Sequence, residues 1–328
     1  TCDETACAVV RDGKEILSNI VATQEDLHQK YGGVIPEIAS REHIKKINHI
    51  TQEALETAQM TLADIDAIAV TSKPGLPGSL LIGVAFAKAL AGSWDKKIIA
   101  VNHLEGHAFS ACIENTIPFP FLCITASGGH TSMYDITDYG AYEILGTTMD
   151  DAAGEAFDKV AKLLKLGYPG GPVIEQLARD VNFTDFFNYP RNKNHNLMFS
   201  FSGLKTAVLY DAVKRGWYDL ENKILLNTTL EAKQQIASSF LVCVGDIFVQ
   251  KVERALQENK AYKALAFVGG VACNKYIKMR LQEIATNHGI KFFFPSPKYC
   301  TDNAGMIAFV GHYKAQRDEF SPLDFDIL

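Results

Sequence analysis

Hydrophobic and polar residues along the chain follow two alternating patterns. Short apolar runs bounded by turn residues predict β-strands, and they lie at 66–71, 97–101, 121–126, 264–268 and 291–294. Apolar positions spaced three and four apart predict helices, and they lie at 35–59, 152–166, 230–258 and 273–287. The polar and aromatic stretch 183–202 has no period and predicts a long loop. Strands that alternate with helices in this way indicate an α/β fold with mostly covered sheets.

Two segments look like copies of one another. Residues 3–22 and 127–148 each read as a polar turn, a strand, a tight turn and a second strand, and Glu-Ile-Leu occurs in both second strands. The second copy has its own leading strand at 121–126, so we expect an equivalent strand ahead of residue 1. The alternative is that any two hairpins look alike. A length of 328 residues fits about two domains.

Composition narrows the class of protein. The chain is 47% hydrophobic and 21% charged, which excludes a disordered, collagen-like or coiled-coil protein. Its 7 cysteines form no C-x-x-C pair, which argues against a disulfide framework or a structural zinc site and indicates the reducing cytoplasm. No apolar run is long enough for a membrane span, since the best two, 80–90 and 236–249, contain Lys88 and Asp246.

Charge limits how the chain could bind nucleic acid. Acidic residues exceed basic ones by 38 − 32, a net charge of −6, whereas nucleic-acid binders usually have a basic surface. Any RNA-binding surface must therefore be local or shared with a partner. Basic clusters at 41–46 and 191–195 are candidates for phosphate contacts, and solvated surface faces are the alternative interpretation of both.

The segment His103-Leu104-Glu105-Gly106-His107 follows a predicted strand and opens a helix. Residues four apart share a helix face, so His103 and His107 could point at one cation, and a helix N-terminus favours the neutral imidazole that binds metals. Two surface histidines are the alternative. Asp302, ahead of the last helix, is a candidate third ligand or a helix N-cap. Two histidines and one carboxylate suit iron(II) or zinc.

The same segment tests a peptidase interpretation. Zincins carry H-E-x-x-H, with the glutamate directly after the first histidine, and the inverted form is H-x-x-E-H. Here Glu105 is at the third position, about 100° further around the helix than in the zincins. A metallopeptidase is therefore disfavoured.

Glycine-rich turns form a second set of candidate sites. They are Ser127-Gly128-Gly129-His130, Asp158 with Gly170-Gly171, and Gly269-Gly270 with Asn274. Such turns let the backbone approach a ligand and offer N–H groups to an anion, and Asp158 could accept hydrogen bonds from ribose hydroxyls. The alternatives are a plain β-turn, a solvated Asp-Lys face and an ordinary strand-to-helix turn. Together the turns predict a nucleotide in an interdomain cleft.

Seven motifs occur in an order that resembles one known family. They are HLEGH (103–107), SGGHT (127–131), GEAFDK (154–159), YPGGP (168–172), SFSGLKT (200–206), GGVACN (269–274) and CTDN (300–303). They resemble the bacterial-type tRNA threonylcarbamoyladenosine transferases, formerly described as O-sialoglycoprotein endopeptidases. The resemblance implies an actin-like, sugar-kinase-like fold of two duplicated α/β domains around a nucleotide cleft. The domains would be 1–118 and 119–302, with the final helix 303–328 returning to the first.

The resemblance also implies an activity and its site. The family moves a threonylcarbamoyl group from L-threonylcarbamoyladenylate to N6 of the adenosine 3′ of the anticodon, in tRNAs reading codons that begin with A, and releases AMP. By resemblance, His103, His107 and Asp302 bind the metal, Fe²⁺ with Zn²⁺ as the other option. The implied substrate contacts are Thr125, Ala126, Ser127, Gly128, Gly129, Asp158, Gly171 and Asn274. The implied partners, besides tRNA, are an inactive paralogous subunit and a small ATPase.

Other roles stay open. His130 and Glu105 are hypotheses for the general base, and Glu175 stands where some family members carry an aspartate contact. A small-molecule kinase of the same fold, a metallopeptidase and a catalytically silent binding subunit are the alternative functions. The kinase would not need the histidine pair, and a silent paralogue would be expected to lack it.

Overall fold

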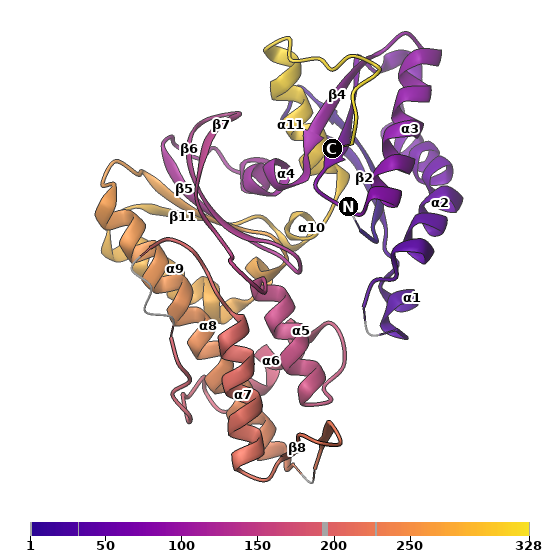
Figure 1. The fold of residues 1–328 in the computed structure, drawn as a ribbon. Helices are drawn as coiled ribbons and strands as arrows, with labels where there is room; N and C mark the ends of the chain where they lie inside the picture. The colour runs from indigo at the N-terminus through magenta and orange to yellow at the C-terminus, as the bar shows by residue number, and fades with distance from the viewer. Residues whose placement is uncertain (1, 32, 192–195, 227, 328) are drawn as a thin grey trace. The chain divides into compact units, whose positions relative to one another are not determined.

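The computed structural model of the chain describes residues 2–31, 33–191, 196–226 and 228–327. Its elements belong to two compact units (Figure 1), each of mixed α/β structure as the sequence predicts. Unit 1 comprises Thr1–Thr116 and Pro295–Leu328, and unit 2 comprises Ile117–Phe294. The predicted domain boundaries differ from these units at residues 117–118 and 295–302, and the assignment of domains stays a prediction.

Unit 1 begins with an antiparallel hairpin of β1 (Thr5–Arg11) and β2 (Glu15–Ala22). Its turn is tight because Asp12 and Gly13 both have positive φ, 52° and 63°, as a type I′ turn requires. A side chain at Gly13 would also lie 2.2 Å from the ring of His312. The Asp-Gly hairpin that the sequence predicts is therefore confirmed.

A parallel pair of strands follows, β3 (Ala67–Lys73) and β4 (Lys97–Asn102). The helices α2 (Pro36–Thr57) and α3 (Pro77–Ser93) each begin with a proline, whose fixed φ suits the first helical position. Figure 1 shows α2 and α3 on one side of these strands and α11 (Ala304–Gln316) on the other. The smaller helices of the unit are α1 (Glu25–Gln29), α4 (His103–Phe109) and α10 (Pro297–Cys300).

Unit 2 is built on one five-stranded sheet in the order β11-β10-β5-β6-β7. β10 (Ala264–Val268) runs parallel to β11 (Lys291–Phe293) and to β5 (Phe121–Ala126). The strands β5, β6 (Thr131–Asp138) and β7 (Ala141–Thr147) are antiparallel. Every residue of β5 and β10 is buried, which explains why both read as continuous apolar runs.

The two units differ at one place in their sheets. Each has a hairpin, β1–β2 or β6–β7, and a parallel pair, β4–β3 or β11–β10. In the part of the chain that the structure describes, a strand joins these two parts in unit 2, where it is β5, and not in unit 1. Among the described residues of unit 1, β1 and β3 each pair along one edge only, and a cavity of about 650 Å³ lies against both strands, bordered by α2 and α11. The strand predicted ahead of residue 1 lies outside the described residues.

Unit 2 also has five α-helices among its described residues. They are α5 (Ala153–Leu163), α6 (Gly170–Arg179), α7 (Ser202–Lys214), α8 (Leu230–Glu258) and α9 (Lys275–Asn287), and a short hairpin joins β8 (Tyr218–Asp219) to β9 (Ile224–Leu225). α8 is apolar and long enough, at 29 residues, to cross a membrane, but 78% of its most apolar window is buried inside the protein. That burial is typical of a core helix, and its Phe248 packs against Phe199, Phe201 and Phe267.

The start of α7, in the SFSGLKT motif, is capped from a distant residue. No side chain of the preceding Phe201 caps the helix. Instead the carboxylate of Asp150 accepts hydrogen bonds from the backbone N–H groups of Phe201 and Ser202 and from the hydroxyls of Ser200 and Ser202. Burial favours a raised pKa for Asp150, but these hydrogen bonds outweigh it and lower the pKa.

We expect Asp150→Ala to lower the free energy of unfolding by about 1 kcal/mol at pH 7, the usual cost of a lost N-cap. Because the folded-state pKa of Asp150 lies below its unfolded value, this contribution is present above pH about 4 and disappears as pH falls further. Urea unfolding at pH 7 and at pH 3 measures both differences. Glu221→Ala, an exposed site, is the control, and equal losses at the two pH values would contradict the capping role.

Candidate metal centre and nucleotide-binding loops

The two histidines of the HLEGH motif lie on one buried face of α4. β4 leads directly into the helix, and the side chain of Asn102 accepts a hydrogen bond from Leu104 N at 2.8 Å, which caps the first turn. Because the histidines are four residues apart, their rings meet edge to face with centroids 4.7 Å apart. They are 7% and 1% exposed, so the alternative of two surface histidines is wrong.

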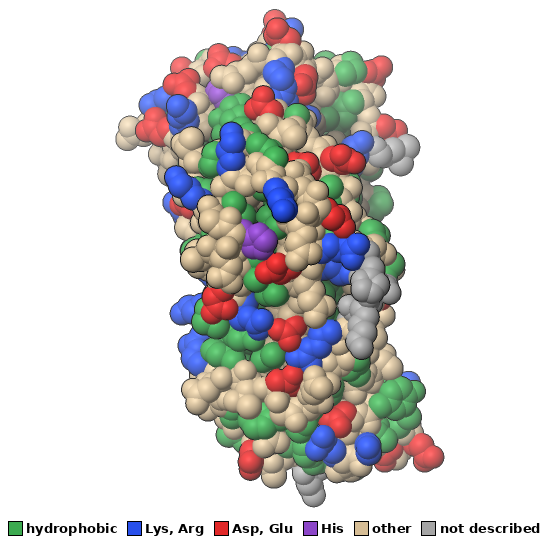
Figure 2. All heavy atoms as spheres, turned by 90° about the vertical axis from the view of Figure 1, so that its left-hand side faces the viewer, with side chains coloured by type: hydrophobic (Ala, Val, Ile, Leu, Met, Phe, Trp, Pro, Cys, Tyr) green, Lys and Arg blue, Asp and Glu red, His purple; other side chains and the backbone are tan. Residues whose placement is uncertain are grey.

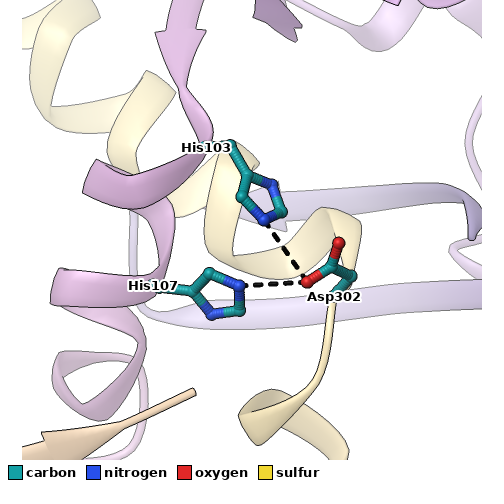
Figure 3. A group of neighbouring side chains, drawn as sticks. All are labelled: His103, His107 and Asp302. Carbon is teal, nitrogen blue, oxygen red and sulfur yellow. Dashed lines mark hydrogen bonds and ion pairs between the residues drawn. The ribbon is translucent and has the colours of Figure 1, made fainter. Parts of the chain in front are cut away.

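Asp302 completes the group. It lies between α10 and α11, and its Oδ1 is 3.3 Å from His103 Nε2 and 3.0 Å from His107 Nε2 (Figure 3). One ligand atom from each of the three residues lies within 4.8 Å of the others. The N-cap of α11 is the neighbouring Asn303, which accepts a hydrogen bond from Met306 N at 3.0 Å. Asn303, and not Asp302, therefore has the capping role that was the alternative for Asp302.

The protonation states of His103 and Asp302 are suited to binding a cation. Burial lowers the pKa of His103 to about 4, against the opposing charge and hydrogen bond of Asp302, so its imidazole is neutral at pH 7. Burial alone would raise the pKa of Asp302, but the interactions with the two histidines contribute to a pKa well below its usual value. Imidazole nitrogens and a carboxylate are the donors that iron(II) and zinc accept, so the residues present fit a metal.

The packing of α4 on α11 holds the histidines in place. A side chain at Gly106 would lie 2.8 Å from Ile307 and 3.2 Å from Met306, so glycine is needed for this approach. Glu105 is 5% exposed, and its carboxylate lies 3.5 Å from the ammonium of Lys314 on α11. It is not a member of the ligand group, and its role as a general base stays a prediction.

The glycine-rich loop of unit 2 connects β5 to β6. Ser127 N donates to His130 O at 2.8 Å, and His130 N donates to Ser127 Oγ at 3.2 Å, so the loop closes on itself. α5 packs on it through Gly154, where a Cβ would lie 2.5 Å from Ser127 O. Among the described residues, the buried Thr125 Oγ1 has no hydrogen-bond partner, as expected of a hydroxyl that a ligand would satisfy.

The turn that begins at Gly269 lies at the same end of the sheet as the Ser127 loop. β5 and β10 end side by side, Thr125 opposite Val268, and Gly269 has a φ of 90° that brings it against the carbonyl of Ala126. Asn274 caps α9 by accepting from Ile277 N at 3.0 Å, so the structural role considered for this turn is present.

Two carboxylates tie the surrounding helices together. Asp158 of α5 accepts a hydrogen bond from Gly170 N at 2.8 Å, and Glu175 of α6 accepts one from Lys275 N at 2.9 Å. Gly171 has open space where a side chain would be. Sequence reasoning missed these structural duties, because each contact joins positions that only the fold brings together.

The basic clusters are largely neutralised by acidic neighbours. Arg41 pairs with Glu37 at 2.6 Å, and Arg191 pairs with Asp185 and Asp246 at 2.6 and 2.8 Å. Residues 192–195 of the second cluster lie outside the described residues. On the face drawn in Figure 2, basic and acidic side chains are interspersed. An RNA surface on either cluster stays a prediction.

Comparison with solved structures places the chain in a fold class. It matches full-length HypF in the phosphate- and nucleotide-bound form with a TM-score of 0.61 at 14% identity, over 97% of this chain and 48% of that one. It matches component A of the Acidaminococcus fermentans (R)-2-hydroxyglutaryl-CoA dehydratase with a TM-score of 0.50 at 18% identity, over 96% and 95% of the two chains. These are actin-like ATPase-fold proteins, so the chain has the actin-like fold that the sequence predicts.

Sequence comparison identifies the family. The family model described as tRNA N6-adenosine threonylcarbamoyltransferase matches residues 15–309. The chain is 45% identical to the enzyme of that name from Clostridium perfringens strain SM101 over 329 aligned residues, 99% of this chain and 94% of the relative. It is 47% identical to that of Thermodesulfovibrio yellowstonii, over 98% and 95% of the two chains. The chain belongs to the tRNA N6-adenosine threonylcarbamoyltransferase family.

We expect His107→Ala and Asp302→Asn each to abolish stoichiometric binding of iron(II) or zinc, because each removes one of three ligands. Reconstitution under anaerobic conditions, desalting and elemental analysis measure bound metal per chain. His288→Ala, which changes a histidine of unit 2 outside the group, should bind as the unchanged protein does. Full retention of metal by Asp302→Asn would remove Asp302 from the ligand set.

Substitution of Gly154 and of Gly171 by alanine tests which of the two glycines is required for packing. Gly154→Ala places a Cβ against the backbone of the Ser127 loop, and we expect a loss of about 1–3 kcal/mol in the free energy of unfolding. Gly171→Ala meets open space and should leave that free energy within about 0.5 kcal/mol. Chemical denaturation measures both, and an equal loss in the two variants would contradict this packing.

Proposed function

We propose that the chain transfers a threonylcarbamoyl group from L-threonylcarbamoyladenylate to N6 of the adenosine 3′ of the anticodon, in tRNAs reading codons that begin with A. The observation that carries the proposal is the family match over residues 15–309 together with the group of two buried histidines, His103 and His107, and the half-buried Asp302. The match supports the transferase class, and the group supports dependence on a metal, with Fe²⁺ our first choice and Zn²⁺ the second.

The proposed reaction exchanges one bond at a carbonyl carbon. N6 of the adenine attacks the carbamoyl carbon, the bond from that carbon to the phosphate oxygen breaks, AMP leaves with the electron pair, and N6 loses one proton. An exocyclic adenine amine is a weak nucleophile, so the carbonyl has to be activated and both substrates oriented. A metal held by His103, His107 and Asp302 would supply Lewis-acid polarisation of an acyl or phosphoryl oxygen.

The residues of unit 2 would bind the adenylate. Backbone N–H groups of Ser127, Gly128 and Gly129 would bind the phosphate and favour the charge that develops on leaving AMP. The contacts proposed around the nucleotide are Thr125, Ala126, Asp158, Gly171 and Asn274. Asp158 has the capacity for this, because a carboxylate accepts more hydrogen bonds than the one it receives from Gly170. His130 and Glu105 remain hypotheses for the base that takes the proton from N6.

The proposal extends to the setting of the enzyme. We place it in the cytoplasm, where its tRNA substrate and a separate source of the adenylate would be found. An inactive paralogous subunit and a small ATPase would supply the RNA-binding surface that the net charge of −6 makes scarce on this chain. We also propose that units 1 and 2 are the two duplicated domains of the actin-like fold. The comparisons offer no support for a small-molecule kinase or a metallopeptidase.

The test uses unmodified tRNA, the full-length protein, its partners, threonine, bicarbonate and ATP, followed by nucleoside digestion and mass spectrometry. We expect a threonylcarbamoyladenosine peak that falls about 100-fold or more in His103→Ala, since even outer-shell changes at metal sites cost 10–100-fold. His288→Ala is the control. Partners are first shown to be competent with a known active homologue. With that control in place, the absence of a peak would overturn the proposal.

A further inference from the structure

Asp302 lies in a short link between two helices. The link consists of residues 301–303 and joins α10 to α11, and Thr301 and Asn303 both have extended backbone angles. A residue outside a helix is not oriented by a helical hydrogen-bond ladder, so other contacts have to hold the side chain of Asp302 in place. Its carboxylate lies 3.3 Å and 3.0 Å from the two histidine nitrogens of α4.

The side-chain amide of Asn303 bonds to the backbone on both sides of Asp302. Its Nδ2 donates a hydrogen bond to Thr301 O at 2.8 Å, and its Oδ1 accepts one from Met306 N at 3.0 Å. These two partners fix the orientation of the amide, because a carbonyl oxygen only accepts and a backbone N–H only donates. The amide is part of a buried residue. It ties the residue before Asp302 to the first turn of α11.

A second amide holds the same turn from a distant part of unit 1. Asn19 of β2 accepts a hydrogen bond from Gly305 N at 3.0 Å through its Oδ1, across 286 residues of sequence. The two amides meet at Gly305, where a Cβ would lie 3.1 Å from Asn303 Oδ1 and 3.5 Å from Asn19 Cγ. The first turn of α11 is therefore fastened both to the link that carries Asp302 and to the β1–β2 hairpin.

We propose that Asn303 and Asn19 are positioning residues of the metal centre, which hold the carboxylate of Asp302 where it shares one cation with the two histidines. These roles depend on the metal centre of the proposed function and on no step of the transfer reaction. Helix capping uses only the side-chain oxygen of Asn303, whereas the bond from its Nδ2 to Thr301 O spans Asp302. Groups that orient the ligands of a metal typically change its affinity 10–100-fold.

The test measures binding of Co²⁺ to the metal-free full-length chain, from its visible absorption, in the absence of tRNA and adenylate. Asn303→Ser keeps a side-chain oxygen for the helix cap, since serine caps about as well as asparagine, but it loses the amide nitrogen. Asn303→Ala loses both. We expect both variants to weaken Co²⁺ binding about tenfold and to change the intensity of the absorption bands. Thermal unfolding should show a larger loss of stability in Asn303→Ala.

Asn19→Ala is an independent variant that leaves the amide of Asn303 in place, and we expect it to weaken Co²⁺ binding in the same way. Thr229→Ala is the matched control. It removes the hydroxyl that accepts a hydrogen bond from Ala232 N and caps α8 in unit 2. This variant should lower thermal stability and still bind Co²⁺ with the affinity and spectrum of the unchanged chain.

Normal affinity and spectrum in Asn303→Ser would overturn the role of Asn303, even if Asn303→Ala binds weakly, because the lost helix cap would then account for the difference. Normal binding by Asn19→Ala would overturn the role of Asn19 in the same way. A separate outcome concerns the proposed function. If the unchanged chain binds no Co²⁺, the metal centre itself is wrong, whereas equal binding by the unchanged chain and the variants removes only the positioning roles.

Discussion

One contact ties distant parts of unit 1 together, that of the half-buried carboxylate of Asp302, which lies within 3.3 Å of two imidazoles. His107 and Asp302 are 195 residues apart in the sequence. Their contact joins α4 to the segment between α10 and α11. A buried charge is costly unless it is paired. Here burial opposes the ionised carboxylate, hydrogen bonds from the two histidines contribute to a pKa that is nevertheless below its usual value, and burial lowers the pKa of His103. An ionised carboxylate next to an uncharged imidazole is stable in the absence of a cation, and these are also the protonation states that bind a metal ion.

Local signals in the sequence predict the parts of the fold that depend on neighbours along the chain. The four-residue spacing of His103 and His107 fixes their common helix face, and Asp12-Gly13 fixes the hairpin, whatever the rest of the fold does. The third predicted ligand is different. Asp302 and Asn303 both have side chains that cap helices, and only the path of the chain into α11 decides that Asn303 caps and Asp302 faces the histidines. The prediction that Asp302 is the third ligand came from the family resemblance, because the sequence pattern alone does not distinguish it from a helix cap.

Contacts between distant positions account for what the sequence does not predict. The residue before α7, Phe201, has no side chain that can cap the helix. The cap is Asp150, 52 residues away from Ser202, so the sequence around α7 does not predict it. Glycines that read as phosphate-binding positions also serve packing, since Gly154 and Gly269 let backbones approach where any side chain would collide. A glycine-rich motif is therefore an ambiguous signal of ligand binding. The same glycine can be required by the packing of neighbouring backbone segments, whether or not a ligand binds there.

The interrupted sheet of unit 1 has a consequence for the chain in solution. β1 and β3 border a common cavity and each pairs along only one edge among the described residues, and an unpaired strand edge is a template for another extended chain. Strands at the edge of a sheet often carry charged side chains that prevent pairing with other chains. Strands inside a sheet are paired on both sides and are commonly apolar. An extended segment that paired with both β1 and β3 would give unit 1 a continuous sheet like that of unit 2.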